Sequence, residues 1–293
     1  MKKALACWTM LGAVWLVHAE DPTGNKQTIE FVRKLQTPGG GFWSLPPGPT
    51  LRIVPTLKAT SAAVRALHYL GGEVPDAEAA KAYVAKCYDA KSGGFSDTPG
   101  ATPDVATTAV GIMAVRELGM PTEPYADGVT KYLTDNAKSL EDIRIAVAGL
   151  ERLQRKSPKS DAWLADVKKA QNADGTFGAG LGQARDTGGS AVILLRLGQT
   201  LDKRDNVLRT LREGQRDSGG FGKADSELEA DLETSYRVMR CFTMLKEKPA
   251  RVEGLRTYVA KCRNADGGYG MSPGEPSNVG ATYFATIVRK WLD

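Results

Sequence analysis

The sequence predicts an all-α protein, an α/α toroid in which six helix pairs form two concentric rings. Two observations predict this fold. A glycine-glycine-aromatic loop recurs along the chain, and two kinds of helical segment alternate between its copies. Segments of the first kind carry apolar residues at three- and four-residue steps with charges between them, whereas segments of the second kind are apolar nearly all round. Because a helix that is apolar on every side must be enclosed, the second kind is expected to form the inner ring.

The loops define the repeat. Their copies are Gly40-Gly41-Phe42, Gly93-Gly94-Phe95, Gly175-Thr176-Phe177, Gly219-Gly220-Phe221 and Gly267-Gly268-Tyr269. Successive aromatic residues lie roughly 45 residues apart, a period typical of repeat architectures, with one double interval between Phe95 and Phe177. A degenerate sixth copy is therefore expected near 137–140. Glycine can end a helix with a positive φ, and the aromatic ring can fill the gap between adjacent pairs. A phosphate-binding loop is not expected, since such loops normally follow a strand.

The elements follow in order from this repeat. The amphipathic segments predict outer helices at 28–35, 82–87, 125–136, 161–171, 205–215 and 257–262. The more apolar segments predict inner helices at 60–70, 105–115, 143–153, 188–195, 232–245 and 279–288. The inner segment 105–115 contains no charged residue, whereas 232–245 carries several.

Acidic and amide residues recur where the inner helices are expected to start. They are Asp104, Asp142, Asp186, Asp231 and Asn278. Asp and Asn are good N-caps, and a hydroxyl residue follows two of them three positions later. If all inner helices start at one rim of the toroid, the same side chains would surround the mouth of a central cavity.

The first residues resemble a secretory signal. Lys2 and Lys3 precede an uncharged apolar stretch at 4–17, and Val17-His18-Ala19 fits a cleavage site. The stretch is too short for an ordinary membrane span, although an uncleaved anchor is the alternative interpretation. We therefore predict a signal peptide at 1–19, a toroid domain at 20–293, a secreted or periplasmic location, and no transmembrane segment after cleavage.

Composition limits the partners and the cysteine chemistry. The chain is 42% hydrophobic and 25% charged, which excludes extensive disorder. The net charge of +5 is spread along helices among acidic residues, so no nucleic-acid partner is expected. Cys87, Cys241 and Cys262 remain after cleavage, and this small odd number does not fit a disulfide scaffold. We interpret them as core residues, with one disulfide as the alternative in an oxidising compartment.

The repeated Gly-Gly-Phe loops, each followed by an Asp-capped inner helix, resemble the β subunits of protein prenyltransferases. The type II protein geranylgeranyltransferase is the most similar. The loop at 171–177 is also similar to the Gln-Trp motifs of squalene and hopene cyclases, with Phe177 in place of Trp. The resemblance spans about residues 25–293. It implies the α/α toroid fold and, at the level of the family, prenyl transfer.

The zinc ligands that this resemblance implies are missing. The family holds zinc with an Asp and a Cys two residues apart and with a His in the next repeat. The matching positions here are Asp186, Gly188 and Thr234, so zinc and other cofactors are not expected. His68, in another repeat, is expected to be a satisfied core histidine.

Two further family sites are only partly matched. The Arg and Lys that bind diphosphate fall near Gly180 and Gln183, where Arg185 is the nearest substitute. The cyclases use an Asp-x-Asp-Asp acid, and the nearest match is Asp231-Leu232-Glu233, which follows Glu227 and Glu229. Capping of the inner helix explains this acidic run equally well.

The candidate residues lie at the expected cavity. Asp186, Asp231 and Glu233 are the catalytic candidates at its mouth, and Arg185, Tyr236, Tyr283 and Phe284 are the ligand-binding candidates. The first functional hypothesis is a prenyltransferase-like protein with an apolar or isoprenoid ligand, with catalysis left open. The second is a non-catalytic scaffold for a protein partner. The third is a glycan-acting enzyme that uses Asp142, Asp186 and Asp231.

Overall fold

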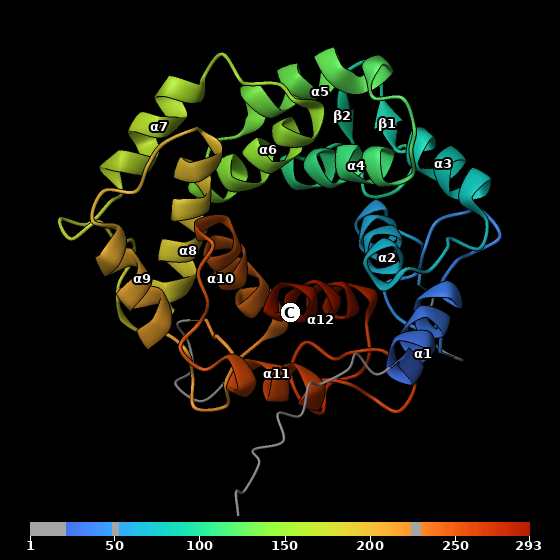
Figure 1. Ribbon diagram of the computed structural model, residues 1–293. Coiled ribbons are helices and arrows are strands. Elements are labelled where there is room, and N and C mark those ends of the chain that lie inside the picture. The colour runs from blue at the N-terminus through green and yellow to red at the C-terminus, as the bar shows by residue number, and fades with distance from the viewer. Residues whose placement is uncertain (1–21, 49–52, 224–229) are drawn as a thin grey trace, which may run out of the picture.

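The computed structural model describes residues 22–48, 53–223 and 230–293, and these residues form a closed ring of helix pairs (Figure 1). In this part of the chain there are twelve α-helices and one two-stranded sheet. The strands β1 (Tyr88–Asp89) and β2 (Gly94–Phe95) pair antiparallel within one of the glycine-rich loops. The predicted all-α toroid of six helix pairs is confirmed.

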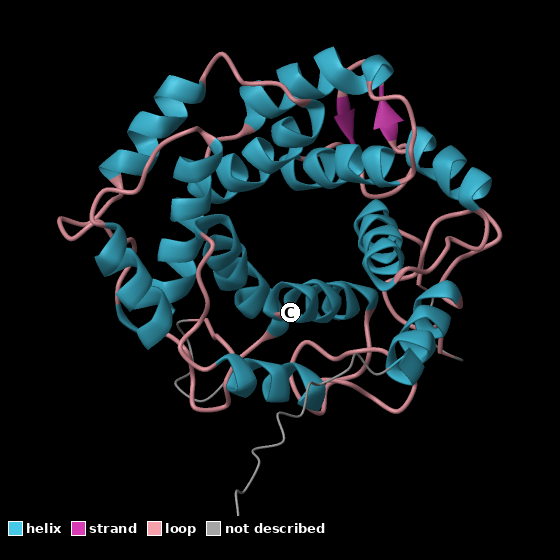
Figure 2. Cartoon of the chain, in the orientation of Figure 1, coloured by secondary structure: helices cyan, strands magenta, loops and turns pink. Residues whose placement is uncertain are grey.

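Odd-numbered helices form the outer ring and even-numbered helices form the inner ring (Figures 1 and 2). The outer helices are α1 (Pro22–Arg33), α3 (Ala77–Lys86), α5 (Glu123–Asn136), α7 (Ser160–Lys169), α9 (Arg204–Glu213) and α11 (Val252–Lys261). The inner helices are α2 (Leu57–Leu70), α4 (Val105–Glu117), α6 (Leu140–Leu153), α8 (Gln183–Arg196), α10 (Leu232–Leu245) and α12 (Val279–Leu292). Each inner helix packs against the next one, and α12 packs against α2, which closes the inner ring.

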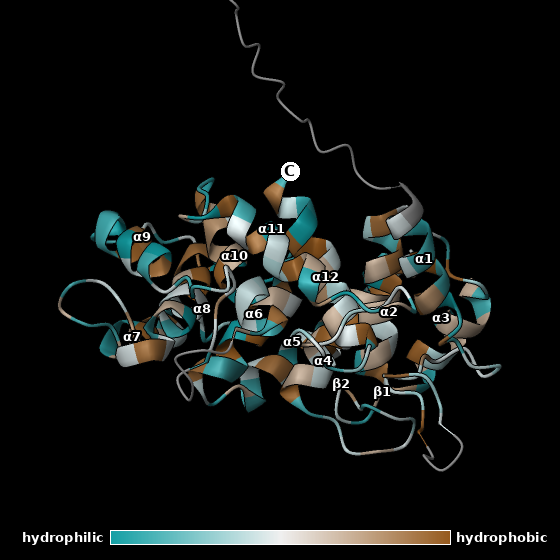
Figure 3. Ribbon diagram, turned by 90° about the horizontal axis from the view of Figure 1, so that it is seen from below, coloured by the Kyte–Doolittle hydropathy of each residue, from teal (hydrophilic) through white to brown (hydrophobic). Residues whose placement is uncertain are grey.

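The outer helices have one wet face and one buried face. Figure 3 shows hydrophilic and hydrophobic residues alternating along α9. Its buried residues are Val207, Leu208 and Leu211, which follow the three- and four-residue spacing of a helix that packs on one side only. No helix of the described chain is both long and apolar enough to cross a bilayer.

Each glycine-rich loop is fastened to the inner helix that follows it. The backbone N–H of the loop's aromatic residue donates to a Thr or Ser hydroxyl of that helix at 2.9–3.1 Å. The pairs are Phe42 with Thr60, Phe95 with Thr108, Phe177 with Thr187, Phe221 with Ser235, and Tyr269 with Thr282. All five aromatic side chains are buried. The hydrogen bond satisfies a buried N–H and fixes the ring between neighbouring pairs.

The first glycine of a loop touches the backbone of the next outer helix. Gly93 has a φ of +79°, and a Cβ atom there would lie 2.6 Å from the carbonyl oxygen of Gly128 in α5. Both the positive φ and this close approach require glycine. The predicted degenerate copy is also in its place, because α5 ends at Asn136 and α6 begins at Leu140, with only a short turn between them.

The ring closes where the first repeat meets the last. The Thr28 hydroxyl donates to the carbonyl oxygen of Gly267 at 2.8 Å, and Arg263 donates to the side chain of Gln27 at 2.7 Å. The last glycine-rich loop therefore contacts α1 in the way that the other loops contact the next outer helix.

The capping predictions are partly confirmed. Asp104, Asp231 and Asn278 are the N-caps of α4, α10 and α12. Asp142 is not the cap of α6, because it is the third residue of a capping box whose cap is Ser139. Asp186 is not a cap either, since α8 already begins at Gln183, after the short 3₁₀ helix η1 (Gly180–Gly182).

One expected core residue is at the surface. The His68 side chain is 64% exposed, with Nδ1 3.9 Å from Glu117, so the prediction of a core histidine is wrong. It lies in the last turn of α2, beyond the enclosed part of the helix. The cysteine prediction is confirmed, because Cys87, Cys241 and Cys262 are all buried, and they are free thiols. Burial raises the pKa of Cys241 to about 12.

Candidate functional site

The inner ring surrounds a central cavity of about 190 Å³, and all six inner helices contribute to its wall. The charged residues of the wall are Arg65, Arg144, Arg152, Arg196, Arg237, Arg240, Glu151 and Glu233. Its aromatic residues are Tyr236, Tyr283 and Phe284. Arginines outnumber glutamates, so the cavity combines positive charge with an aromatic surface and is not the purely apolar funnel expected for a neutral hydrocarbon.

Four of the six arginines are paired with carboxylates. The pairs are Arg144 with Glu141 at 2.7 Å, Arg152 with Glu117 at 3.5 Å, Arg196 with Glu151 at 3.0 Å, and Arg237 with both Glu141 at 2.9 Å and Glu233 at 2.5 Å. These pairs neutralise most of the charge that faces the cavity.

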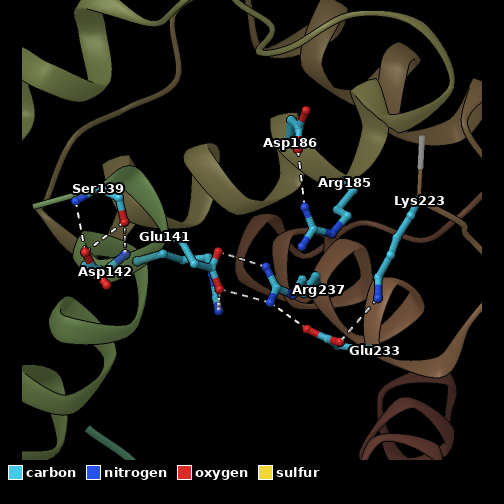
Figure 4. A network of polar contacts seen from close by, with 9 residues as sticks. Ser139, Glu141, Asp142, Arg185, Asp186, Lys223, Glu233 and Arg237 are labelled. Atoms are coloured by element: carbon cyan, nitrogen blue, oxygen red, sulfur yellow. Dashed lines mark hydrogen bonds and ion pairs between the residues drawn. The ribbon is translucent and has the colours of Figure 1, made fainter. Parts of the chain in front are cut away.

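An ionic bridge crosses from α6 to α10 (Figure 4). Arg237 binds Glu141 through two hydrogen bonds of 2.9 Å and also contacts Glu233, which lies 3.8 Å from Lys223. Helix α8 lies between α6 and α10 in the ring, and its Gly189 faces the Arg144 side chain of α6. A Cβ atom at Gly189 would lie 3.5 Å from the Arg144 side chain, which is an ordinary van der Waals distance.

The bridge keeps Glu141 ionised. Burial acts to raise its pKa, but the hydrogen bonds and positive charges of Arg144 and Arg237 outweigh burial and lower this pKa to about 2. At neutral pH Glu141 therefore carries its negative charge.

Arg65 of α2 is nearly enclosed and contacts aromatic and sulfur atoms. The residue is 7% exposed, and its guanidinium lies 4.2 Å from the centre of the Tyr283 ring. It also donates to the Tyr283 hydroxyl and lies 3.7 Å from the sulfur of Met113. Its Nε has no partner within the described residues. A cation–π contact therefore takes the place of a carboxylate partner.

Arg240 of α10 has similar surroundings. Its guanidinium lies 4.4 Å from the centre of the Trp291 ring and 5.5 Å from that of Tyr236. It donates to the Tyr236 hydroxyl at 3.4 Å, and its Nε also has no partner in the part of the chain described. The rings of Tyr236 and Trp291 stack 5.5 Å apart. Arg240 is thus held against an aromatic pair at the wall of the cavity.

Arg65 and Arg240 both affect the pKa of Tyr236. Burial alone would raise the pKa of the Tyr236 phenol, but Arg240 and Arg65 outweigh burial and lower this pKa well below its ordinary value. Burial and the neighbouring Tyr236 raise the pKa of Tyr283. The centre of the cavity is therefore a region of positive potential.

Two further pockets adjoin the central cavity. One, of about 480 Å³, has a mostly apolar surface and shares Arg65, Val110, Tyr283 and Phe284 with the cavity. The other, of about 360 Å³, lies at the rim and shares Arg144, Gly189 and Arg237 with it. Since Arg144 and Arg237 belong to the ionic bridge, the bridge separates the rim pocket from the central cavity.

The structure brings four of the seven predicted site residues together. Glu233, Tyr236, Tyr283 and Phe284 line the central cavity. Arg185 and Asp186 line the rim pocket instead, with the Arg185 guanidinium 3.6 Å from the Asp186 carboxylate. Asp231 lines none of the three pockets described here, because its carboxylate caps α10 by accepting hydrogen bonds from Thr234. Glu227 and Glu229 lie outside the described residues.

Sequence reasoning missed the arginines of the cavity. Arg65 interrupts an otherwise apolar stretch of α2, and Arg240 lies in the inner segment already noted for its charges. A charged residue inside a helix that must be enclosed is the available signal. It gives no information about which of these residues meet across the ring.

The residues at the implied zinc site do not fit zinc. Asp186 lies beside Arg185, Gly188 has no side chain, and the Thr234 hydroxyl donates to Asp231. Zinc in proteins takes thiolate, imidazole and carboxylate ligands, of which only Asp186 could serve. Within the described residues, no three His, Cys, Asp or Glu side chains group closely enough to hold a metal ion.

Several solved structures share this fold. The type II terpene cyclase MstE from Scytonema, in its apo form, is 10% identical with a TM-score of 0.63, covering 92% of this chain and 97% of that chain. A variant of the same cyclase in complex with geranylgeranyl dihydroxybenzoate is 10% identical with a TM-score of 0.62, covering 92% and 96%. A wild-type glycosidase is 11% identical with a TM-score of 0.59, covering 92% and 96%. At these identities the likeness concerns the fold alone.

Sequence comparison gives the family. A search of curated proteins finds no match. The sequence profile of the prenyltransferase alpha-alpha toroid domain, in contrast, matches residues 1–76, 69–143 and 125–292, and thus almost the whole chain. The matched segments contain all six helix pairs of the ring. The chain therefore belongs to the prenyltransferase alpha-alpha toroid family.

Proposed function

We propose that this protein binds an elongated apolar molecule of the isoprenoid kind in the apolar pocket that adjoins its central cavity, without zinc-dependent prenyl transfer. The observation that carries this proposal is the apolar pocket of about 480 Å³, which continues into the aromatic wall of the central cavity at Tyr283 and Phe284. Its volume lies in the range of roughly 300–1,000 Å³ that is usual for small-molecule sites. Apolar walls with a few polar groups are also typical of such sites.

The similar structures support this ligand class. The cyclase from Scytonema binds geranylgeranyl dihydroxybenzoate, in which an isoprenoid chain is joined to an aromatic acid. A ring of the same fold thus accommodates an isoprenoid in that protein. The ligand proposed here has the same general character, an apolar chain long enough to extend from one pocket into the next.

The carboxylates of the cavity favour binding over acid-initiated cyclisation. Such a reaction needs a protonated acid that faces the ligand. Glu151 and Glu233 are each paired with an arginine, and the low pKa of Glu141 keeps that side chain ionised. At neutral pH Glu141 therefore has no proton to donate, and the arginines occupy the other two carboxylates.

Glycan hydrolysis is less well supported. Asp142 and Asp231 are held in capping hydrogen bonds, and Asp186 is paired with Arg185. A glycosidase needs one carboxyl group as acid and another as base or nucleophile, and capping occupies two of the three candidates. The glycosidase among the similar structures supports only the common fold.

We further propose that the protein acts outside the cytoplasm. The basis is the leader predicted at 1–19, which lies outside the described residues. Amino-terminal sequencing of protein recovered from the exported fraction tests this proposal. Cleavage after Ala19 would give Glu20 as the first residue, and a chain that still begins at Met1 would contradict it.

A pocket-filling variant tests the binding function. Ala62 lines the apolar pocket from α2, and Ala62→Phe is expected to weaken binding of geranylgeraniol at least about tenfold by occupying the space of the chain. Isothermal titration calorimetry measures this change. Ala85→Phe is the matched control, because Ala85 is exposed on the outer helix α3 and lines none of the pockets described above.

The outcomes separate the two leading functions. Binding by the wild-type protein and by Ala85→Phe, together with weak binding by Ala62→Phe, supports the apolar pocket as the ligand site. A wild-type protein that binds no isoprenoid, neutral or anionic, contradicts the proposal and favours a protein-binding scaffold.

A further inference from the structure

We infer that Arg65 and Arg240 form a site for an oxyanion head group, a carboxylate or a phosphate, on an amphiphile whose apolar chain lies in the adjoining pocket. This inference rests on the proposed function and narrows its ligand class. The ligand would be an anionic amphiphile in place of a neutral isoprenoid.

The balance of charge in the cavity is the first argument. Arg144, Arg152, Arg196 and Arg237 each contact a carboxylate. Arg65 and Arg240 contact none within the described residues, although both are largely enclosed. Removing a cation from water is unfavourable unless an anion or a set of hydrogen bonds compensates for it. Two such cations line one cavity without a carboxylate partner, which indicates that the compensating anion comes from a ligand.

The arrangement of the donors is the second argument. Arg65 lies against Tyr283 and Arg240 lies against Tyr236, and the centres of these two rings are 5.7 Å apart. The aromatic contacts fix the two guanidinium groups in place. The Nε atoms of both have no partner in the described chain. A guanidinium presents its donors as a planar fork that matches the oxygens of a carboxylate or phosphate.

The position of Arg65 is the third argument. It lines both the central cavity and the apolar pocket. An oxyanion held at Arg65 would therefore leave the attached chain beside Ala62, Val279 and Phe284, which line the apolar pocket. Polar and apolar surfaces meet at one residue, as the binding of an amphiphile requires.

This site differs from the one that the family resemblance implied. Arg185, the nearest substitute for the diphosphate-binding residues, lies in the rim pocket beside Asp186. The bridge between Glu141 and Arg237 separates that pocket from the central cavity. The proposed head-group site is thus on the other side of the bridge and uses α2 and α10.

Three ligands with one apolar chain test the inference. Geranylgeraniol is neutral, geranylgeranoic acid carries a carboxylate, and geranylgeranyl diphosphate carries phosphates. Calorimetric titration of the mature wild-type protein is expected to give at least about tenfold tighter binding for an anionic ligand than for the alcohol. Arg65→Gln and Arg240→Gln are each expected to weaken anion binding roughly 10- to 100-fold and to change alcohol binding less than about twofold.

Arg152→Gln is the matched control. It removes the same charge from the same cavity, but Arg152 already has Glu117 as a partner. If Arg152→Gln weakens anion binding as much as Arg65→Gln, a general positive field explains the binding and the specific site is wrong. Arg65→Lys keeps the charge but not the fork, so it is expected to recover only part of the lost affinity.

The remaining outcomes are also decisive. Equal binding of the alcohol and both anions would overturn the head-group site and leave the proposed isoprenoid function intact. Binding of none of the three would overturn the function itself. Inorganic pyrophosphate is the chain-free probe: if it binds as tightly as geranylgeranyl diphosphate, the site recognises a free anion and the amphiphile is wrong.

Discussion

Single arginines determine what the cavity can hold. The wall places guanidinium groups in a space where a simple hydrocarbon binder would have apolar side chains. Two of them, Arg65 and Arg240, lie against aromatic rings. An aromatic face stabilises a guanidinium less than a paired carboxylate would. In the unliganded protein these residues are therefore expected to store unfavourable electrostatic free energy.

Replacement of Arg65 by methionine tests this expectation. Met is unbranched and fills much of the same volume without charge. Because a buried charge with no carboxylate partner is removed, the Arg65→Met protein without ligand should melt at the same temperature as the wild type or above it. Thermal unfolding followed by circular dichroism measures this, with and without geranylgeranyl diphosphate. A fall of more than about 4 °C without ligand would instead assign Arg65 a structural role.

Glu141 gives a prediction about pH. Its pKa in the folded protein is about 2, below the ordinary value of 4.5, so its ion pairs contribute fully above pH 4.5 and are lost as the pH falls toward 2. Glu141→Gln should lower the melting temperature by about 2–4 °C at pH 7, a modest change because the side chain is half exposed. The difference from the wild type should disappear between about pH 4.5 and 2. A difference that persists unchanged at pH 2 would contradict the role of the bridge.

Local spacing predicted some residue roles and could not predict others. Asp104 and Asp231 were identifiable as caps because a cap and its partner lie three residues apart in the sequence. The cavity arginines were not identifiable, since their partners or lack of partners depend on helices that are distant in sequence. The wrong prediction for His68 has the same cause, because the position of His68 in a helix did not show that the last turn of α2 is exposed.

At the scale of the elements, the loops and inner helices are joined by one repeated hydrogen bond. In the second repeat the Thr108 hydroxyl accepts from the backbone N–H of Phe95 at 2.9 Å. Removal of the hydroxyl leaves a buried donor unsatisfied, so Thr108→Val should lower the free energy of unfolding by about 1–3 kcal/mol. Thr108→Ser keeps the hydroxyl and should stay closer to the wild type. Urea denaturation measures both, and equal stability of the two variants would contradict this role.

Element positions were mostly predictable from sequence. Glycine-rich loops and apolar periodicity gave the order of the helices, because both are local properties. The starts of α1, α3, α8 and α11 were placed five or six residues too late, and that of α8, for example, at 188 instead of Gln183. The apolar pattern begins only where the helix enters the core, whereas the helix itself continues directly from the short 3₁₀ turn at Gly180–Gly182.

At the scale of the whole molecule, ring closure places every inner helix at one cavity. The contact of Thr28 with Gly267 joins the first repeat to the last, and the packing of α12 on α2 completes the wall. Residues from α2, α10 and α12 therefore meet although the sequence separates them widely. The fold could be derived from the repeat. Which side chains meet at the centre could be seen only in the closed ring.

The metal content of the whole protein is a separate prediction. Gly188 and Thr234 cannot supply the thiolate and imidazole that zinc would need beside Asp186. Protein purified without chelators should therefore contain far less than one zinc ion per chain by elemental mass spectrometry. One tightly held zinc per chain would contradict this reading of the two positions and would revive prenyl transfer as an activity.

The closed ring is proposed to bind one anionic amphiphile at its centre. Native mass spectrometry of the mature protein, mixed with equal amounts of geranylgeraniol and geranylgeranyl diphosphate, tests it most directly. We predict a single added mass that corresponds to one diphosphate ligand per chain, and its loss in the Ala62→Phe variant. A spectrum that shows only the unliganded protein, or equal occupancy by the alcohol, would contradict the claim.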